Sequence, residues 1–107
     1  MQLINDQTSG GSGPAHISVH PSGRAVFVAN YGSGSIASYV VRPDGGLSAP
    51  VSEFTYSAAG KQSLAHAAIT SPDGRWLLVN DLGLDRIVIY RVDADTCLLY
   101  TSDAADE

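Results

Sequence analysis

The chain has 107 residues, of which 11 are acidic and 6 are basic, and its formal net charge is −5. This length allows one small domain or a piece of a larger one. The acidic balance disfavours binding to nucleic acid, because no excess of basic side chains is present to neutralise phosphates. The apolar runs are far shorter than the roughly 20 residues of a membrane-spanning helix, and the single cysteine excludes a disulfide framework. The first six residues show no signal-peptide pattern, so we expect a cytoplasmic protein that does not bind a membrane.

The chain up to residue 56 alternates short apolar segments with turn residues, a pattern typical of antiparallel strands. Ile17 and Val19 alternate with polar neighbours and predict a short first strand. The turn that follows contains Pro and Gly, whose backbone preferences favour a reversal of the chain. Further strands are predicted over residues 24–30, 35–41 and 47–56, and no window shows helical amphipathicity. The sequence therefore predicts an all-β fold.

The same order of segments recurs about 50 residues later. His16 aligns with His66 at an offset of 50, and after one extra residue, Ser71, the offset becomes 51. Residues 21–24 (PSGR) then match residues 72–75 (PDGR). Repeats of this length are typical of solenoids, arrays and propellers, in which one unit cannot bury its faces alone.

Four short antiparallel strands per repeat match one blade of a β-propeller. We predict a fragment of a propeller with about two blades of four-stranded antiparallel sheet: a stub over residues 1–9, a blade over 10–60 and a partial blade over 61–96. Propellers close with about 4–8 blades, so two blades leave apolar faces uncovered. We therefore expect the chain alone to be unstable or to aggregate, and to be inactive.

The last eleven residues, 97–107, resemble the translation of a transposase-type sequencing adapter. A segment of that origin has no place in the native fold, so we set it aside as non-native. The alternative is a natural acidic tail. Because these residues include the only cysteine and three acidic residues, neither feature carries functional information.

Blade geometry brings polar side chains to one rim of the predicted fold. The first strand of a blade lines the central channel and the chain then zigzags outward, so the first strand starts on the rim where the second strand ends. This places His16 and His66, at the starts of innermost strands, with Asn30 and Asp81, at the ends of second strands. Arg86 follows in a turn on the same side. Working groups of such scaffolds commonly lie on loops at one end, so these residues form the candidate site.

Each of these residues can instead have a purely structural role. His16 and His66 can hydrogen-bond the backbone at strand starts, and Asp81 can satisfy backbone N–H groups of a turn. Arg86 can form an ordinary surface ion pair. A metal held by the two histidines and Asp81 is a weak alternative. His20 lies beside a turn on the far rim, where we expect it to face solvent.

Three segments carry a family resemblance: residues 9–19 (SGGSGPAHISV), residues 28–35 (VANYGSGS) and residues 71–90, from SPDGR through NDLGLDR to Tyr90. Together they resemble the lactonase family of seven-bladed β-propellers, which includes bacterial 6-phosphogluconolactonases and fungal carboxymuconate cyclases. The resemblance implies hydrolysis of a sugar lactone, namely 6-phosphogluconolactone of the pentose phosphate route. The family shows His-Ala-His before the second innermost strand, and here Leu64 replaces the first of these, which leaves His66.

Lactone hydrolysis needs a base that activates water and a group that stabilises an oxyanion. We expect His66 to act as the base, since neutral imidazole suits this role near pH 7, with Asp81 orienting it or sharing the role. We expect His16, Asn30 and Arg86 to bind the substrate, and Arg pairs well with phosphate. No cofactor or metal is needed, and the expected partner is a small sugar lactone. The alternatives are a non-catalytic propeller scaffold or ligand-binding module, and a lactonising cyclase.

Overall fold

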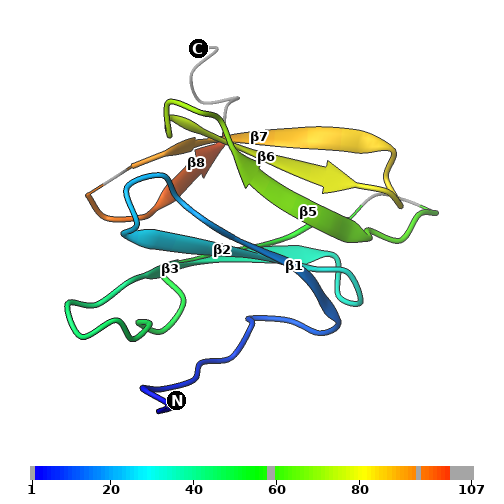
Figure 1. Cartoon of the computed structure of the whole chain (residues 1–107). Coiled ribbons are helices and arrows are strands. Elements are labelled where there is room, and N and C mark those ends of the chain that lie inside the picture. Colours follow the sequence, from blue (N-terminus) through cyan, green and yellow to red (C-terminus); the bar gives the residue numbers. More distant parts are fainter. Residues whose placement is uncertain (1, 58–59, 94, 102–107) are drawn as a thin grey trace.

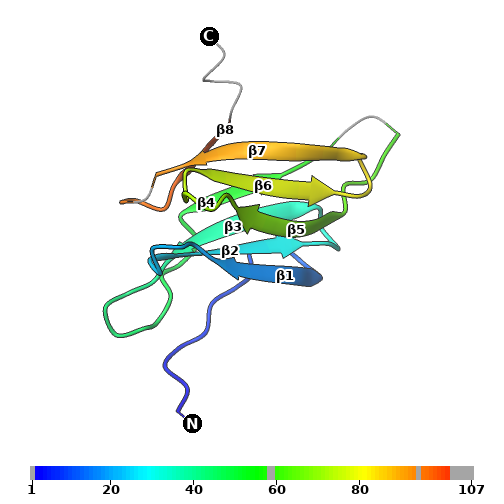
Figure 2. The ribbon, with the colours of Figure 1, turned by 45° about the horizontal axis from the view of Figure 1, so that its top comes forward.

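The computed structural model describes residues 2–57, 60–93 and 95–101 and consists of two four-stranded antiparallel sheets. Within each sheet the strands follow in chain order, β1-β2-β3-β4 in the first sheet and β5-β6-β7-β8 in the second. Figures 1 and 2 show the two sheets stacked face to face. The strands are β1 (Pro14–Val19), β2 (Ala25–Asn30), β3 (Ser35–Val40), β4 (Ser52–Thr55), β5 (Ala65–Thr70), β6 (Trp76–Asp81), β7 (Arg86–Val92) and β8 (Leu99–Thr101).

The all-β prediction is confirmed, because the described residues contain no helix. The predicted inner strands agree with the structure to within a few residues. The predicted outer strand 47–56 is interrupted in the structure, where the strand β4 covers only Ser52–Thr55. The part before Pro50 lies beside the end of β3, with a bridge between Val41 and Leu47 and a hydrogen bond from Ser48 N–H to Val40 (2.9 Å). No helix of the described chain is long and apolar enough to cross a membrane.

The main core lies between the two sheets. Its buried side chains come from both sheets: Ala25, Phe27, Ala29, Ile36, Ala65, Ala68, Leu77, Val79, Tyr90, Val92, Cys97 and Leu99. β5 packs against β1 and β2, so the innermost strands of the two sheets approach each other. Every residue of β2 is buried, whereas β6 alternates between buried and exposed residues. The middle strands of the first sheet, β2 and β3, are therefore covered on both faces, whereas the second sheet is covered on only one.

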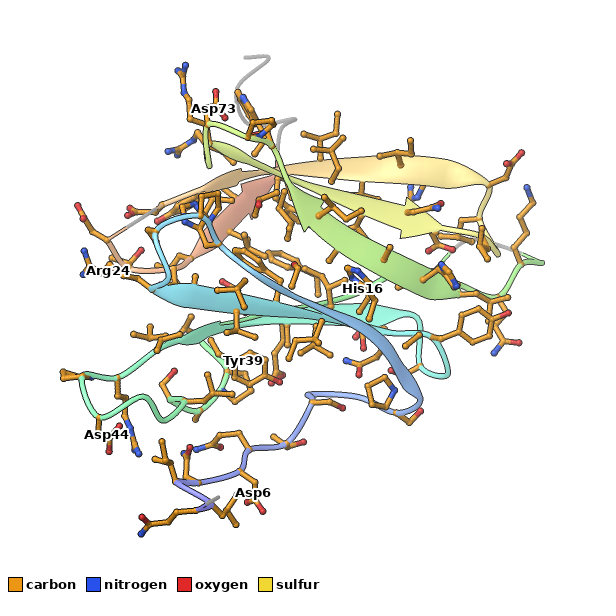
Figure 3. All side chains as sticks on the ribbon, in the orientation of Figure 1. Asp6, His16, Arg24, Tyr39, Asp44 and Asp73 are labelled. Atoms are coloured by element: carbon orange, nitrogen blue, oxygen red, sulfur yellow. The ribbon has the colours of Figure 1, made fainter. Side chains whose placement is uncertain are left out.

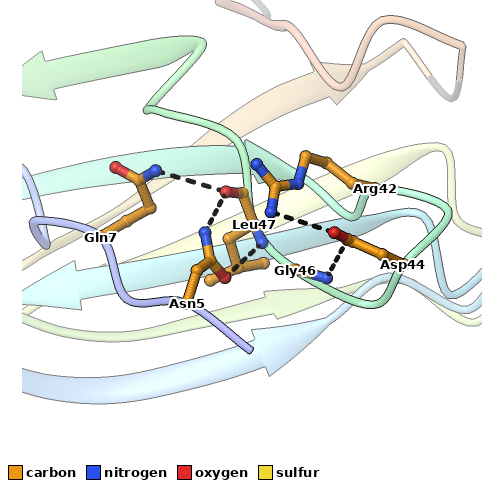
Figure 4. Close-up of polar contacts among 6 residues, drawn as sticks. All are labelled: Asn5, Gln7, Arg42, Asp44, Gly46 and Leu47. Carbon is orange, nitrogen blue, oxygen red and sulfur yellow. Dashed lines mark hydrogen bonds and ion pairs between the residues drawn. The ribbon is translucent and has the colours of Figure 1, made fainter. Parts of the chain in front are cut away.

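The second cover of the first sheet is the segment before β1. Asn5 donates to the carbonyl oxygen of Leu47 (2.9 Å) and accepts from its backbone N–H (3.0 Å), and Gln7 donates to the same carbonyl (3.3 Å), as Figure 4 shows. The same turn is closed by an Asp44 carboxylate that accepts from Gly46 N–H (2.8 Å). The hydroxyl of Tyr39 donates to Thr8. These bonds hold the segment over a small cluster formed by Val26, Val28, Ala37 and Tyr39.

The structure corrects the offset of the internal repeat at its start. In the first sheet Pro14 pairs with Asn30 and His16 with Ala29, with a bulge between Pro14 and His16. In the second sheet Ala65 pairs with Asp81 and Ala67 with Asn80, with the same bulge. The offset is therefore already 51 at these strands, so His66 corresponds to Ala15, and His16 corresponds to Ala67.

The turns that follow the first strands obey the same offset. His20 N–H donates to Ala25, and Ser71 N–H donates to Trp76, so Ser71 is the counterpart of His20 rather than an extra residue. The prediction that the two histidines hold equivalent positions is wrong. Since successive side chains of a strand point to opposite faces, an error of one residue changes the face that a side chain occupies.

The second sheet is completed by residues from the segment that we set aside. Leu99 pairs with Val92 and Tyr100 with Arg91, so β8 takes the place of a fourth, outer strand. Cys97 and Leu99 are buried in the main core. The second sheet thus extends past residue 96, where we placed the end of the native sequence.

Candidate functional site at the rim

The strand pairing brings the start of each innermost strand beside the end of the next strand. Pro14 lies opposite Asn30 and Ala65 lies opposite Asp81. The backbone of both sheets therefore has the rim geometry that the sequence predicted. The side chains of the predicted site residues differ strongly in their surroundings.

Asp81 is buried and accepts three hydrogen bonds. Its carboxylate accepts from the hydroxyl of Ser63 and from the backbone N–H groups of Leu64 and Leu84, each of the latter at 3.0 Å. Burial alone would raise the pKa of the Asp81 carboxyl, but these hydrogen bonds outweigh it and hold the pKa below its usual value. Asp81 thereby fixes both the connection that enters β5 and the turn after β6.

Asn30 is the counterpart of Asp81 in the first sheet and is fully buried. Its side-chain amide donates to the carbonyl oxygen of Ser9 (2.8 Å) and to the hydroxyl of Ser35 (3.3 Å). Its side-chain oxygen is buried and has no hydrogen-bond partner among the described residues. Asn30 thus ties the segment before β1 to the rim, and its surroundings leave no surface for contact with a ligand.

His16 lies between the two sheets, where Figure 3 labels it. Its Nδ1 accepts a hydrogen bond from the backbone N–H of Ala68 in β5 (3.2 Å). An imidazole nitrogen that accepts from an N–H carries no proton, so the neutral ring is held as the tautomer protonated at Nε2. His16 can therefore donate a hydrogen bond through Nε2, and it borders a pocket of about 420 Å³ beside Pro14 and Ile17.

His66 is exposed because it is the extra residue of the bulge at the start of β5. Its ring stands edge-on to the ring of Tyr31, with centroids 6.2 Å apart. Tyr31 follows directly after β2, so this contact joins the rims of the two sheets. Bulges commonly aim a side chain away from the ladder, and here the bulge presents an imidazole at the rim.

Arg86 begins β7, the third strand of its sheet, and its guanidinium lies 5.7 Å from the ring centroid of Tyr56. The hydroxyl of Tyr56 shares a hydrogen bond with that of Tyr90. Burial raises the pKa of both phenols, to about 12 for Tyr90, so both stay neutral at ordinary pH. Arg86 is thus held over an aromatic side chain at a distance from the innermost strands.

Comparison with known protein families identifies the family to which these two sheets belong. The family model described as "Lactonase, 7-bladed beta-propeller" matches residues 1–105. The chain belongs to this lactonase family. The two sheets are two blades of a β-propeller, as the sequence predicted.

Individual similar proteins agree with this family assignment. The 6-phosphogluconolactonase of Bacillus subtilis (strain 168) is 31% identical over 97 residues, which cover 86% of the chain and 28% of the relative. A crystal structure from Bacteroides uniformis ATCC 8492 has a TM-score of 0.85 at 27% identity, with 94% of the chain and 31% of that structure covered. The periplasmic gluconolactonase of Pseudomonas aeruginosa has a TM-score of 0.75 at 29% identity, with 85% and 26% covered. The chain thus spans about a quarter to a third of these relatives.

One further prediction from the sequence is wrong. His20, expected to face solvent, is buried at the contact between the blades. Its Nε2 bonds the carbonyl oxygen of Gly74 in the second blade (2.7 Å), and its Nδ1 lies 2.9 Å from the hydroxyl of Ser22. The turn of the neighbouring blade covers the far rim, which the sequence of one blade does not reveal. His20 is therefore a structural link between blades.

The structure also identifies a rim residue that the sequence reading missed. Ser63 is buried and bonds both Asp81 and the carbonyl oxygen of Gly34, so it links the second blade to the first. Its counterpart 51 residues earlier is Ser12, and the correct offset would have marked this pair. Within residues 2–57, 60–93 and 95–101 no three His, Cys, Asp or Glu side chains are placed to hold a metal ion. The metal alternative from the sequence therefore has no support in the geometry.

Proposed function

We propose that this chain is part of a lactone hydrolase that opens a sugar lactone, with 6-phosphogluconolactone as the substrate. The observation that carries the proposal is the exposed imidazole of His66, presented on a bulge at the rim of a lactonase propeller. The Bacillus subtilis relative bears the name of this activity. A cytoplasmic location belongs to the proposal, and cell fractionation distinguishes it from the periplasmic location of the Pseudomonas aeruginosa relative.

In the proposed reaction His66 takes a proton from a water molecule whose oxygen attacks the lactone carbonyl carbon. The carbonyl oxygen becomes an oxyanion, and the tetrahedral intermediate collapses with cleavage of the bond to the ring oxygen. The ring oxygen takes the proton back from the His66 imidazolium, so the product is the open hydroxy acid and the base is regenerated. General-base catalysis of this kind contributes roughly 10²–10⁴ in rate.

The surroundings of the other residues favour particular roles. His16 offers an N–H at Nε2, which suits an oxyanion or a substrate hydroxyl, since its Nδ1 is occupied by Ala68. Asp81 is favoured as a positioning residue rather than as a second base, because its carboxylate already accepts from Ser63, Leu64 and Leu84. Through Leu64 it holds the backbone two residues before His66.

For Asn30 and Arg86 we propose more distant roles. Asn30 is buried and stabilises the rim through the hydrogen bonds of its side-chain amide to Ser9 and Ser35. Arg86 supplies positive charge for the phosphate, although its guanidinium rests on Tyr56 in the absence of substrate. Substrate that recruits Arg86 would have to draw it away from this ring.

The test is an assay of the full-length parent protein with 6-phosphogluconolactone, corrected for the rapid spontaneous opening of the lactone. Gluconolactone without the phosphate serves as the second substrate. We expect turnover of the phosphorylated lactone and a lower kcat/KM for the unphosphorylated one. Turnover of neither lactone would contradict the proposal and favour a non-catalytic scaffold.

A further inference from the structure

Tyr31 contacts the proposed base from the neighbouring blade. It follows directly after β2, and its ring centroid lies 6.2 Å from that of His66, with an angle of 77° between the two ring planes. Figures 1 and 2 show the end of β2 beside the start of β5, where His66 lies. The side chain of Tyr31 is 38% exposed. The contact between the two rings therefore lies at the surface of the rim, where the proposed site is.

The ring of His66 lacks the support that a catalytic imidazole commonly has. Such a ring is usually oriented by a hydrogen bond at one of its nitrogens. His16 shows a bond of this kind, from the N–H of Ala68 to its Nδ1. His66 is the exposed extra residue of a bulge, and in the described part of the chain neither of its ring nitrogens forms a hydrogen bond. Among these residues the contact with Tyr31 takes the place of the orienting bond.

The turn that carries Tyr31 is fixed within the first blade. The N–H of Tyr31 donates to the carbonyl oxygen of Gly13 (2.8 Å), and the N–H of Gly34 donates to the carbonyl oxygen of Asn30 (2.9 Å). A Cβ added to Gly13 would lie 2.8 Å from the backbone nitrogen of Gly32, so the two chain segments touch there. Hydrogen bonds and close packing thus hold the backbone from which the Tyr31 ring projects.

The same turn is bonded to the segment that carries His66. The carbonyl oxygen of Gly34 accepts a hydrogen bond from the hydroxyl of Ser63 (3.2 Å), which is buried between the blades. Gly34 lies three residues after Tyr31, and Ser63 lies three residues before His66. The hydrogen bond and the ring contact therefore join the same two segments at two points. Two such contacts fix the relative orientation of the segments, and with it the position of one ring against the other.

We propose that Tyr31 is a positioning residue for His66: its ring holds the imidazole in the orientation in which it takes a proton from water. This inference rests on the proposed function, in which His66 is the general base. Tyr31 acts through His66 and not on the substrate, so its ring is needed and its hydroxyl is not. An edge-on aromatic pair favours one arrangement by roughly 2–12-fold in an equilibrium constant. Loss of the ring lowers the share of correctly oriented base, and so lowers kcat rather than raising KM.

The experiment uses the full-length parent protein. Tyr31→Leu removes the ring and keeps an apolar side chain, whereas Tyr31→Phe, the matched control, removes only the hydroxyl. With 6-phosphogluconolactone, kcat is expected to fall roughly 2–12-fold in Tyr31→Leu and to stay at the wild-type value in Tyr31→Phe, with KM little changed in both. In the His66→Ala background Tyr31→Leu is expected to have no further effect, because the two residues act as one unit.

NMR of isotope-labelled histidine gives a measurement that does not depend on turnover. The imidazole resonances of His66 are identified by their absence from the spectrum of His66→Ala. Because a neighbouring aromatic ring shifts the resonances of nearby protons, Tyr31→Leu is expected to move them and Tyr31→Phe to leave them in place. Tyr31→Met replaces Tyr31→Leu if circular dichroism shows that the latter has lost its strands.

The outcomes separate this inference from the function on which it rests. Wild-type kcat in Tyr31→Leu would overturn the proposal, whether or not the His66 resonances move. An equal loss of kcat in Tyr31→Phe would also overturn it, and would indicate that the hydroxyl acts on the substrate. A wild-type parent that does not turn over the lactone would contradict the proposed function itself, and the role of Tyr31 would fall with it.

Discussion

His66 in the second blade occupies the place of Ala15 in the first blade, not that of His16. Both residues are the extra residue of a bulge at the start of an innermost strand. His16 lies one position further on and faces the second blade, where Ala68 bonds it. The two imidazoles of the rim are therefore not copies of one role, and they are expected to respond differently to substitution.

Replacement of His66 by Ala is expected to lower kcat/KM for 6-phosphogluconolactone by roughly 10²–10⁴ in the full-length parent, because the proposed general base is lost. The variant should fold like the wild type, since His66 is exposed and its ring contacts only the edge of Tyr31. The measurement is the pH dependence of kcat/KM. In the wild type kcat/KM should fall at low pH, where the base becomes protonated, and this fall should be absent in the variant. Arg75→Gln, at an exposed position on the opposite rim, serves as a control away from the site, and unchanged turnover in His66→Ala would remove His66 from the mechanism.

The sequence predicted the strands and the rim well because these depend on local signals. Turns such as 21–23 and 72–74 and the alternation of apolar residues fix the order of strands, and strand order fixes which ends meet. The sequence could not predict the bulges, which insert one residue without changing the composition. It therefore gave the wrong alignment of His16 with His66 and made Ser71 an extra residue.

Contacts between blades were equally hidden from the sequence. His20 is buried because the Gly74 turn of the other blade lies on it, and Ser63 reaches both Gly34 and Asp81. Neither contact follows from the pattern within one repeat. The backbone of Asp81 lies at the rim, as predicted. Its carboxylate, however, already accepts three hydrogen bonds that stabilise the fold.

Replacement of Asp81 by Asn is expected to destabilise the chain by about 1–3 kcal/mol at pH 7, because an amide cannot accept all three of the hydrogen bonds that the carboxylate accepts. The folded-state pKa of Asp81 is lowered. Its stabilisation is therefore fully present above the unfolded pKa of about 4 and is lost as pH falls through the lower folded value. Urea unfolding followed by the fluorescence of Trp76, the one tryptophan, measures the difference at several pH values.

The difference between wild type and Asp81→Asn should thus shrink below about pH 4. Asp85→Asn is the matched control, since Asp85 lies in the same rim turn but is exposed. A gap between wild type and Asp81→Asn that stays constant down to pH 2 would show that the carboxylate charge does not stabilise the rim.

Gly34 and Asp85 are counterparts in the rim turns, and both have positive φ, 66° and 54°. A Cβ added to Gly34 would lie 2.4 Å from the Cβ of Ser63 and 2.6 Å from its carbonyl oxygen. Gly34→Ala is therefore expected to cost about 2–4 kcal/mol, from the left-handed conformation and the overlap together. Asp85→Gly should instead gain up to about 1 kcal/mol, because it removes the same backbone strain without a steric change.

Urea unfolding of both variants checks this pair. A Gly34→Ala variant as stable as the wild type, or an Asp85→Gly variant less stable than the wild type, would contradict the expectation. The comparison also tests the offset of 51, because the offset is what makes the two positions equivalent.

Removal of residues 97–107 is expected to destabilise the chain, although this segment resembles an adapter translation and was set aside as non-native. The structure buries Cys97 and Leu99 in the core between the blades and pairs Leu99 with Val92. Burial of one large apolar side chain contributes roughly 1.5–3 kcal/mol, so the truncated chain should unfold at a clearly lower urea concentration. The truncation also removes two hydrogen bonds: one from the hydroxyl of Ser38 to the carbonyl oxygen of Cys97 (2.9 Å) and one from Leu99 N–H to the hydroxyl of Ser52 (3.1 Å).

The thiol of Cys97 provides a second, independent measurement on the intact chain. Burial raises its pKa, so the thiolate that reacts with disulfide reagents is scarce as well as shielded. We expect slow labelling in buffer and fast labelling in urea, with a transition that coincides with unfolding. Truncation to residue 101, which keeps β8, is the matched control for truncation to residue 96. A thiol that reacts at the unfolded rate in buffer, together with equal stability of the two truncated chains, would show that the outer strand of the second blade contributes nothing to the fold.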